Sequence, residues 1–562
     1  MGNKILARSL NRMAQEITAQ RHFILYAFLI GIGIRLLMGL QGFDTVDMGF
    51  CMTFYQNIFW HPESMPFYFN YYLTGFIGGL WQWAFADWGL LGFRLLDVLA
   101  RAATILILYR TFRAYIPSER IAAFTILLAF LFPTYIITFH YNTVSVLLLS
   151  VSLYLFTKAY QHKCVKWMFA AGIALGITLF ARSVNLALTP LLLLPLIHFN
   201  EMALKTRISF TTAHIIGFAI GILSILCLLW GTGQITYFYD GLNEAFCFFF
   251  TDKSDFTSTH TSGNIVWSYL ISWKNVVAQL IALLLICAAY VYSSHLQPNI
   301  GRLLKVLSII SLFVLAYTSL AYITLLTVCL LIVGIAMRNH NVPRDIIPAV
   351  AYAIIGTLLL PIGSDMGMTR IFNHIAQLLI FPTAICAVQI KSATVHKLLP
   401  YCYASIAFSA VGYFIFFPYE EEKPRWSLTT KTIDKTLNVY TDSDKAACYN
   451  NIIDKILTYG HDVPTLLMGS QNSELYYATG KLPFTTSTQA TTYNGEILPK
   501  QLAKQELFYK HLPIVVFLKK NQSKNEIQAQ KELRPWLAKK RYVCVYEDSD
   551  LIIYKSNYKT SL

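Results

Sequence analysis

The chain has 562 residues, of which 55% are hydrophobic and only 13% are charged, and its mean hydropathy is +0.49. Soluble globular proteins carry about 25% charged residues, so the composition excludes an ordinary soluble domain and predicts a polytopic α-helical membrane protein. The net charge of +15 does not indicate nucleic acid, because the chain shows no nucleic-acid-binding motif and basic residues in membrane proteins first orient the loops.

Apolar runs of about 18–20 residues recur along most of the chain, which is the length needed to cross the hydrocarbon core of a bilayer. The first predicted span is 22–40, and the basic residues before it place the N-terminus in the cytoplasm. Between successive short basic loops there is room for two spans, which gives about thirteen helices and a final exit near Phe417. These basic loops end at Arg120 or occupy 158–166, 198–207, 293–305, 338–345 and 391–397.

Two predicted outer loops, 41–93 and 232–274, are large. From residue 419 the composition becomes charged and polar, so we expect a transmembrane domain over 1–418 and an extracytoplasmic domain over 419–562. Short β-like runs alternate with helical stretches in this tail and predict an α/β or α+β fold. The runs are TLLMG (465–469), IVVFL (514–518), YVCVY (542–546) and LIIYK (551–555).

Glycine and cysteine patterns add local expectations. GxxxG pairs inside spans predict close helix packing, and the DSD at 548–550 predicts a hairpin turn between two β-like runs. Cys448 and Cys544 are the only cysteines of the tail, and we predict that they form a disulfide. The GxxxG pairs are Gly75–Gly79, Gly172–Gly176 and Gly217–Gly221.

The stretch GFDTVDMGF (42–50) places Asp44 and Asp47 where the chain leaves the bilayer. The following FCMTFYQNIF repeats apolar residues at i and i+4, which predicts an amphipathic helix lying in the interface. A Trp- and Tyr-rich stretch at headgroup level comes next, and a return span carries Asp97 and Arg101, four residues apart and expected to form an ion pair.

This order resembles the GT-C glycosyltransferases, in particular the protein O-mannosyltransferase and lipid A aminoarabinose transferase branch. The matching pieces in the first 200 residues are Asp47, Pro66 followed by FYFNYYL, FRLLDVLAR at 93–101, and GIALGITLFARSVN at 172–185. Met48 stands where the family usually has Glu, SMPF replaces the Lys-Pro-Pro signature, and the lysine that helps to hold the donor phosphate has no clear equivalent. The resemblance implies sugar transfer from a polyprenyl-phosphate-linked donor.

The residues support this chemistry independently. A phosphate leaves as a stable anion, so transfer needs no acid at the leaving group, and one general base with cations on the phosphate suffices. Asp47 is the predicted base, and Asp44 is predicted to orient it or to bind a hydroxyl. Two alternatives stay open: both are solvated loop acids, or Asp44 caps the following helix.

Arginine suits the donor phosphate because its charge is permanent and its donors form a planar fork. Arg182, Arg370 and Arg94 sit at outer ends of predicted spans, with anchoring as the alternative role and a structural role favoured for Arg94. Acids among aromatic residues are predicted to bind the sugar or acceptor. They are Asp240 and Glu244 together with Asp252 and Asp255 in the second outer loop, and Asp365, in the turn GSDMG (363–367), is a similar candidate.

The sequence therefore predicts an inverting glycosyltransferase of the plasma (inner) membrane, acting on its extracytoplasmic face. Its expected partners are a polyprenyl-phosphate-sugar donor, membrane lipids and a glycan, lipid or protein acceptor. No cofactor is predicted, although the loop acids leave a Mg²⁺ or Mn²⁺ site open. A transporter or flippase of lipid-linked sugars and a surface-polysaccharide ligase or polymerase are the alternatives. A flippase moves the lipid-linked sugar without consuming it, so turnover separates the classes.

Overall fold

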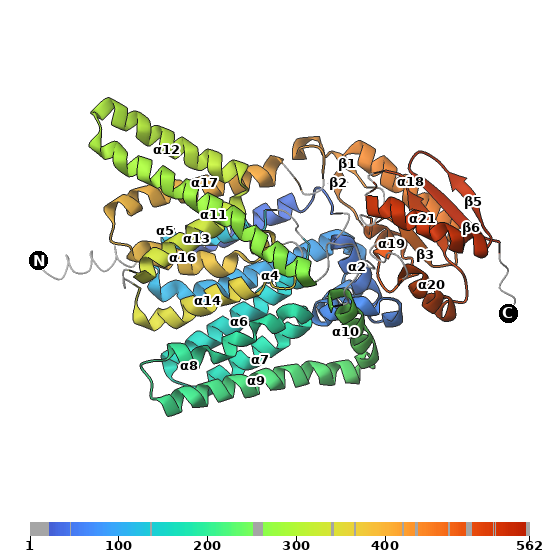
Figure 1. Ribbon diagram of the computed structural model, residues 1–562, viewed down its shortest axis with the longest axis horizontal. Helices are drawn as coiled ribbons and strands as arrows, with labels where there is room; N and C mark the ends of the chain where they lie inside the picture. The colour runs from blue at the N-terminus through green and yellow to red at the C-terminus, as the bar shows by residue number, and fades with distance from the viewer. Residues whose placement is uncertain are drawn as a thin grey trace, which may run out of the picture.

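The computed structural model describes residues 22–557 apart from 45–46, 135–137, 251–261, 339–341, 365–366, 417, 419–420, 433–436, 470–471, 491–496, 521 and 523. Asp252, Asp255, Asp365 and the predicted domain boundary at 419 lie outside the described residues. The molecule is elongated, with a helical part at one end of its long axis and an α/β part at the other (Figure 1).

Among the described residues up to 416, the named secondary-structure elements are all helices. An apolar helix, His22–Met38, comes first. The labelled helices are α2 (Asp47–Asn57), α3 (Tyr72–Ala84), α4 (Gly89–Phe112), α5 (Glu119–Phe130), α6 (Tyr141–His162), α7 (Val165–Ala181), α8 (Leu194–His198), α9 (Leu204–Gly231), α10 (Ile235–Phe250), α11 (Ser262–Tyr292), α12 (Pro298–Thr318), α13 (Ala321–Arg338), α14 (Ile347–Leu359), α15 (Gly367–Ile375), α16 (Gln377–Gln389) and α17 (Ala393–Phe416).

Six described helices are long and apolar enough to cross a membrane: α6, α9, α11, α12, α13 and α17. The pair α15 and α16, bent by 80°, makes a seventh if it is one span. The polytopic helical architecture is therefore as the composition predicted, whereas the count of about thirteen spans stays a prediction. Other predicted spans are built from shorter apolar helices, including His22–Met38 and α7.

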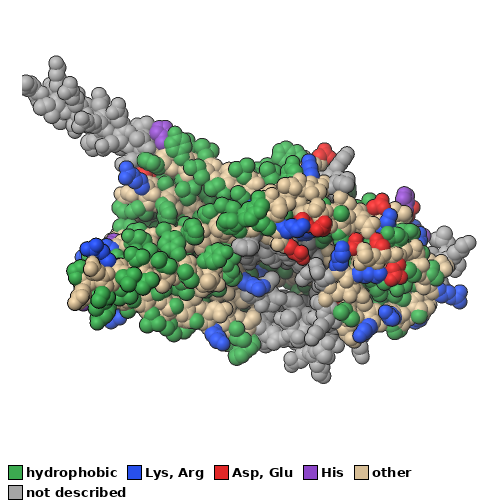
Figure 2. Space-filling view, turned by 90° about the horizontal axis from the view of Figure 1, so that it is seen from above, with side chains coloured by type: hydrophobic (Ala, Val, Ile, Leu, Met, Phe, Trp, Pro, Cys, Tyr) green, Lys and Arg blue, Asp and Glu red, His purple; other side chains and the backbone are tan. Residues whose placement is uncertain are grey.

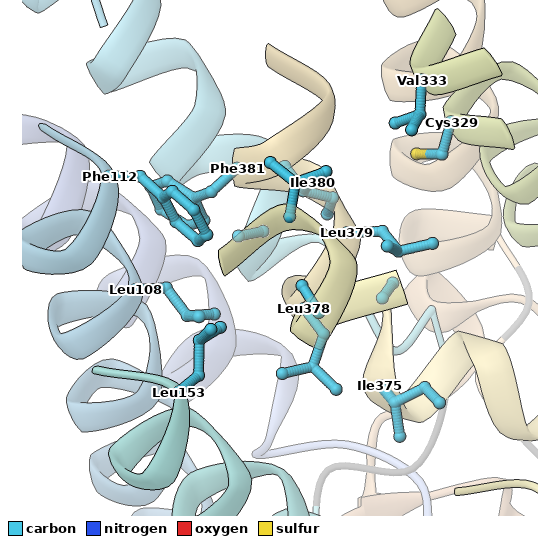
Figure 3. Packing of buried hydrophobic residues seen from close by; sticks show 14 of the residues in the cluster. Leu108, Phe112, Leu153, Cys329, Val333, Ile375, Leu378, Leu379, Ile380 and Phe381 are labelled. Atoms are coloured by element: carbon cyan, nitrogen blue, oxygen red, sulfur yellow. The ribbon is translucent and has the colours of Figure 1, made fainter. Parts of the chain in front are cut away.

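A buried apolar core joins α4, α6, α13 and α16. Figure 3 shows Leu108 and Phe112 of α4 near Leu153 of α6, with side chains of α16 between them and α13. Hydrophobic side chains also cover much of the outer surface of the helical part, whereas charged side chains gather on the α/β part (Figure 2). This distribution fits helices that face lipid, because a bilayer imposes no cost on exposed apolar groups.

The predicted close packing at the GxxxG pairs is present between α7 and α9. A Cβ added at Gly172 would lie 2.1 Å from the carbonyl oxygen of His214, and one at Gly217 would lie 2.1 Å from that of Phe169. Both distances are far shorter than any real contact, so only glycine lets the two backbones approach this closely.

The α/β part contains the four predicted strands in one mixed sheet of order β3-β4-β6-β5. Strand β3 runs parallel to β4, and the other neighbours are antiparallel. Two short strands, β1 (Thr430–Lys431) and β2 (Tyr440–Thr441), form a separate ladder. The other elements are α18 (Ser443–Tyr459), β3 (Thr465–Met468), α19 (Glu474–Thr479), α20 (Ile497–Phe508), β4 (Ile514–Leu518), α21 (Lys524–Lys539), β5 (Tyr542–Glu547) and β6 (Leu551–Ser556).

Two local predictions for the tail have opposite outcomes. The DSD at 548–550 forms the predicted turn between β5 and β6, where Asp548 Oδ1 accepts hydrogen bonds from the amides of Asp550 (2.7 Å) and Leu551 (2.9 Å). The predicted disulfide is wrong, because Cys448 and Cys544 are both free thiols. Cys448 lies on helix α18, whereas Cys544 is exposed on strand β5 at the edge of the sheet, so the two thiols belong to different layers.

Candidate active site

The start of the acidic turn, residues 42–44, is held to the helical part by Arg94. This buried guanidinium, on α4, donates hydrogen bonds to the carbonyl oxygens of Gly39 and Gly42. The Asp44 carboxylate is buried and accepts a hydrogen bond from the amide of Met48 (3.3 Å) in the first turn of α2. Asp44 therefore satisfies one of the free amides at the start of a helix, while Arg94 ties the chain before that helix to α4.

The α/β part holds the same turn from the other side. Lys445 Nζ donates to the carbonyl oxygen of Phe43 (3.1 Å) and to Glu421 Oε1 (2.9 Å), and it lies 4.1 Å from the centre of the Phe43 ring. Glu421 Oε1 also accepts from the Phe43 amide (3.2 Å). Since Tyr440 of β2 exchanges backbone hydrogen bonds with Leu40 and Gly42, the turn is clamped between the two parts of the chain.

Asp47 is the first residue of α2, and its side chain is outside the described part of the structure. Helical spacing places position 47 on the same face as Phe50 and Cys51, one turn further on. The Phe50 ring stacks on Tyr68 (centroids 5.1 Å apart) and lies 6.4 Å from the ring of Tyr141 at the start of α6. The helix that begins at the predicted base therefore leads into an aromatic cluster.

Arg182 lies on the far side of Tyr141. Arg182 directly follows the last residue of α7, and its guanidinium lies 5.3 Å from the centre of the Tyr141 ring. It donates to the carbonyl oxygen of Gly363 (3.1 Å) and more weakly to that of Leu360 (3.5 Å). Only 6% of the residue is exposed, and no carboxylate of the described residues pairs with it. A buried cation without a counter-charge is costly, so this position favours an anionic ligand.

A chain of buried polar groups lies behind the aromatic cluster. Arg101 Nε donates to Asp97 (2.6 Å), the ion pair that the spacing predicted. The Thr143 hydroxyl donates to Asp97 Oδ1 (2.6 Å) and contacts His140 Nδ1 (3.0 Å), and His140 Nε2 contacts His374 Nδ1 (3.2 Å). No local sequence pattern indicates the His140–His374 contact, because 234 residues separate the two histidines.

The remaining predicted site residues are spread more widely. Arg370, in the first turns of α15, and Asp240, on α10, are exposed. Glu244 is mostly buried and lies 3.7 Å from Lys504 of the α/β part, and its burial raises the pKa of the carboxyl group while Lys504 opposes that shift. The structure therefore places Asp44 close to Arg94. Position 47 is connected to Arg182 through the rings of Phe50 and Tyr141. Asp240, by contrast, lies on the surface.

Glu474 is a carboxyl group near the acidic turn that the sequence analysis missed. It begins α19 and it is fully buried. Burial holds the pKa of Glu474 well above its ordinary value, with nearby Tyr449 and Lys445 opposing the shift and the charge of Asp44 adding to it. Its only sequence signal is an acid among the apolar residues of SELYYA, which helix capping also explains.

A polar cavity of about 580 Å³ lies at the carboxyl ends of the parallel strands β3 and β4, and Lys445 and Tyr449 line it. Its lysines are ion-paired with its acids, and the pairs are Lys423 with Asp442, Lys445 with Glu421, and Lys520 with Asp550. In the described part of the chain, no group of three or more His, Cys, Asp and Glu side chains could hold a metal ion.

These features define a polytopic membrane protein that has a buried arginine, Arg182, without a carboxylate partner among the described residues, and a buried aspartate, Asp44, in the turn before α2. Residues 83–230, from α3 to α9, match the family described as dolichyl-phosphate-mannose-protein mannosyltransferase. This match confirms the predicted resemblance to membrane glycosyltransferases of the GT-C class, and the matched segment includes Arg94, Asp97 and Arg182.

No curated protein matches the chain significantly. Among solved structures, the chain is similar to ArnT from Cupriavidus metallidurans in the apo state, with 14% identity and a TM-score of 0.43. The same protein bound to undecaprenyl phosphate gives 13% identity and a TM-score of 0.44. Each comparison covers 95% of this chain and 98% of that protein.

Proposed function

We propose that the chain is an inverting glycosyltransferase that transfers a sugar from a polyprenyl-phosphate-linked donor to an acceptor on the extracytoplasmic face. The observation that carries this proposal is Arg182, a buried arginine without a carboxylate partner among the described residues, in a segment that matches a family of lipid-phosphate-sugar-dependent transferases. Family and site chemistry agree, because the phosphate of such a donor supplies the missing counter-charge.

Arg182 is suited to clamp a phosphate. Two carbonyl oxygens and the Tyr141 ring fix its guanidinium, so little conformational entropy is lost when the anion binds. As the carbon–oxygen bond breaks, negative charge builds up on the leaving phosphate, and a fixed cation in a water-poor site stabilises that charge. Arg370 is a second, more exposed candidate for the same phosphate.

The transfer step needs one proton acceptor. The acceptor's hydroxyl oxygen forms a bond to the anomeric carbon while the bond from that carbon to the phosphate oxygen breaks. The electron pair leaves with the polyprenyl phosphate, and the hydroxyl proton passes to the carboxylate of Asp47. Attack from the face opposite the leaving group inverts the configuration. In this scheme Asp44 positions the start of α2 through its bond to the Met48 amide.

The orientation of this scheme follows from charge. The basic loop before α9 lies at the end of the helices away from the sheet, as Figure 1 shows. Basic loops face the cytoplasm, so the α/β part and the acidic turn would lie outside, in our proposal at the plasma membrane. Residues 1–418 would form the membrane domain and 419–562 the outer domain. The acceptor, whether glycan, lipid or protein, would arrive from that side, where Asp365, Asp240 and Glu244 are candidates to bind it.

The test measures release of polyprenyl phosphate from purified, glycosylated polyprenyl phosphate. We expect Arg182→Gln to lower kcat/KM about 100-fold or more, because two charge-assisted hydrogen bonds to the phosphate are lost. Arg207→Gln, which removes an arginine from the opposite end, is the matched control and should turn over normally. Normal turnover by folded Arg182→Gln would refute the role of Arg182. Movement of the donor without its consumption by the wild-type protein would identify a flippase instead.

A further inference from the structure

A basic cavity lies at the other end of the helices from the acidic turn. It has a volume of about 420 Å³ and lies between the last turn of α4, the 3₁₀ turn η4 (Arg113–Tyr115) and the last turns of α6. Three cationic side chains line it, namely Arg110, Arg113 and Lys158, and no carboxylate does. The charged side chains that line this cavity are therefore all positive.

No carboxylate among the described residues forms an ion pair with these three cations. No side-chain hydrogen bond or ion pair joins Arg110, Arg113 or Lys158 to a described residue, and the Lys158 ammonium group lies 5.8 Å from the centre of the Tyr154 ring. In the polar cavity of the α/β part, by contrast, each lysine is ion-paired. Like charges around one cavity repel one another, and a bound anion would remove that repulsion.

The exposed leucines on the outer face of α4 indicate which class of anion would bind in the basic cavity. Leu99 and Leu106 are 48% and 39% exposed, and they are seven residues apart, so they lie on one face of the helix. Arg113 follows seven residues after Leu106, and Arg110 lies one turn after it. An exposed apolar stripe thus runs directly into the basic cavity. This order of groups matches a lipid, with acyl chains along the leucines and an anionic headgroup at the arginines.

We propose that the basic cavity binds the phosphate headgroup of an anionic phospholipid, with its acyl chains along Leu99 and Leu106. The basic loops mark this end as cytoplasmic, and the cytoplasmic leaflet holds the anionic lipids that attract juxtamembrane cations. Because α4 and α6 also carry Arg94 and Tyr141 at their other ends, the bound lipid would stabilise the two helices that frame the candidate active site.

The test compares lipid retention in two kinds of bilayer nanodisc. The protein is reconstituted with phosphatidylcholine alone or with a minor fraction of phosphatidylglycerol, and native mass spectrometry counts the lipids that remain bound. We expect the wild type to retain phosphatidylglycerol preferentially and to gain thermal stability from it. The cavity variant Arg110→Gln/Arg113→Gln/Lys158→Gln should lose this preference about 10- to 100-fold, since each cation near anionic lipid contributes roughly a fivefold attraction.

Matched variants separate the possible sources of the effect. Lys166→Gln/Lys205→Gln/Arg302→Gln removes the same charge from basic loops outside the cavity and should keep the preference. Leu99→Ser/Leu106→Ser keeps the cations and should weaken retention, whereas a site for small anions would be unaffected. Glycerol phosphate should stabilise the protein far less than phosphatidylglycerol. Equal retention by the folded cavity variant, equal loss in the loop variant, or equal protection by glycerol phosphate would each overturn the proposal.

Discussion

The backbone of Glu474 in the α/β part lies directly against Gly49 of α2, so that a Cβ at position 49 would be 2.1 Å from the Glu474 amide nitrogen. The Thr53 hydroxyl, one turn further along α2, faces the carbonyl oxygen of Ser473 at 3.5 Å. Helix α2, which begins with the proposed catalytic base, therefore packs so closely on the α/β part that position 49 has no space for a side chain. This contact makes the site depend on both parts of the chain.

Gly49→Ala should separate the two parts, because its methyl group meets backbone atoms that have no alternative rotamer. We expect a loss of about 1–3 kcal/mol in unfolding free energy, measured as a lower thermal midpoint of the purified protein. Gly33→Ala is the control, since a Cβ there has nothing within 4 Å and alanine favours a helix by up to about 1 kcal/mol. Equal midpoints for the two variants would contradict the close contact.

Glu474→Gln should change how stability depends on pH. The pKa of Glu474 is raised in the folded state by burial, so above the ordinary glutamate pKa the folded protein holds a proton that the unfolded chain has released. Stability therefore falls as pH rises from that ordinary value towards the raised one. The glutamine variant should lose this slope and be at least as stable as wild type at neutral pH. Thermal midpoints across pH measure it, with exposed Glu422→Gln as the control. An unchanged slope would contradict the raised pKa.

Asp47→Asn should leave a folded protein that still retains its lipid donor but turns over at least about 100-fold more slowly, because the amide cannot accept the acceptor's proton. Asp44→Asn should cost less, since its main described contact is a helix-capping hydrogen bond that an amide oxygen also accepts. Both are measured as polyprenyl phosphate release. If Asp47→Asn is as active as wild type, the base lies elsewhere, with Asp44 as the next candidate.

Cys544 offers a test of orientation, because its side chain is exposed in the α/β part. In a variant whose only cysteine is Cys544, a membrane-impermeant maleimide should label intact cells. A cysteine placed instead at Lys166, in a basic loop, should react only after the cells are permeabilised. The reverse pattern would invert the proposed topology.

Reductant should leave the thermal midpoint of the wild type unchanged, since Cys448 and Cys544 are not bonded.

Most of the fold that could be predicted from the sequence follows from patterns between residues that are close together in the chain. The apolar runs, the four β-like runs, the turn at 548–550, the Asp97–Arg101 pair and the glycine pairs of α7 and α9 all depend on residues a few positions apart. Backbone hydrogen bonding imposes fixed periods on helices and strands, so such patterns are readable without a structure. The prediction of a disulfide was wrong because local spacing does not show that Cys448 and Cys544 lie in different layers of the α/β part.

The site itself was decided by contacts that no local period encodes. Arg182 is fixed by the carbonyl oxygen of Gly363, 181 residues away, and the acidic turn is clamped by Lys445, which lies 402 residues from Phe43. The sequence alone indicated which residue types suit the chemistry and which side of the membrane they would occupy. Only tertiary packing decided that Arg182 is buried without a carboxylate partner among the residues that the structure describes, and that Glu474 lies near Asp44. Desolvation of a side chain depends on what every other segment covers.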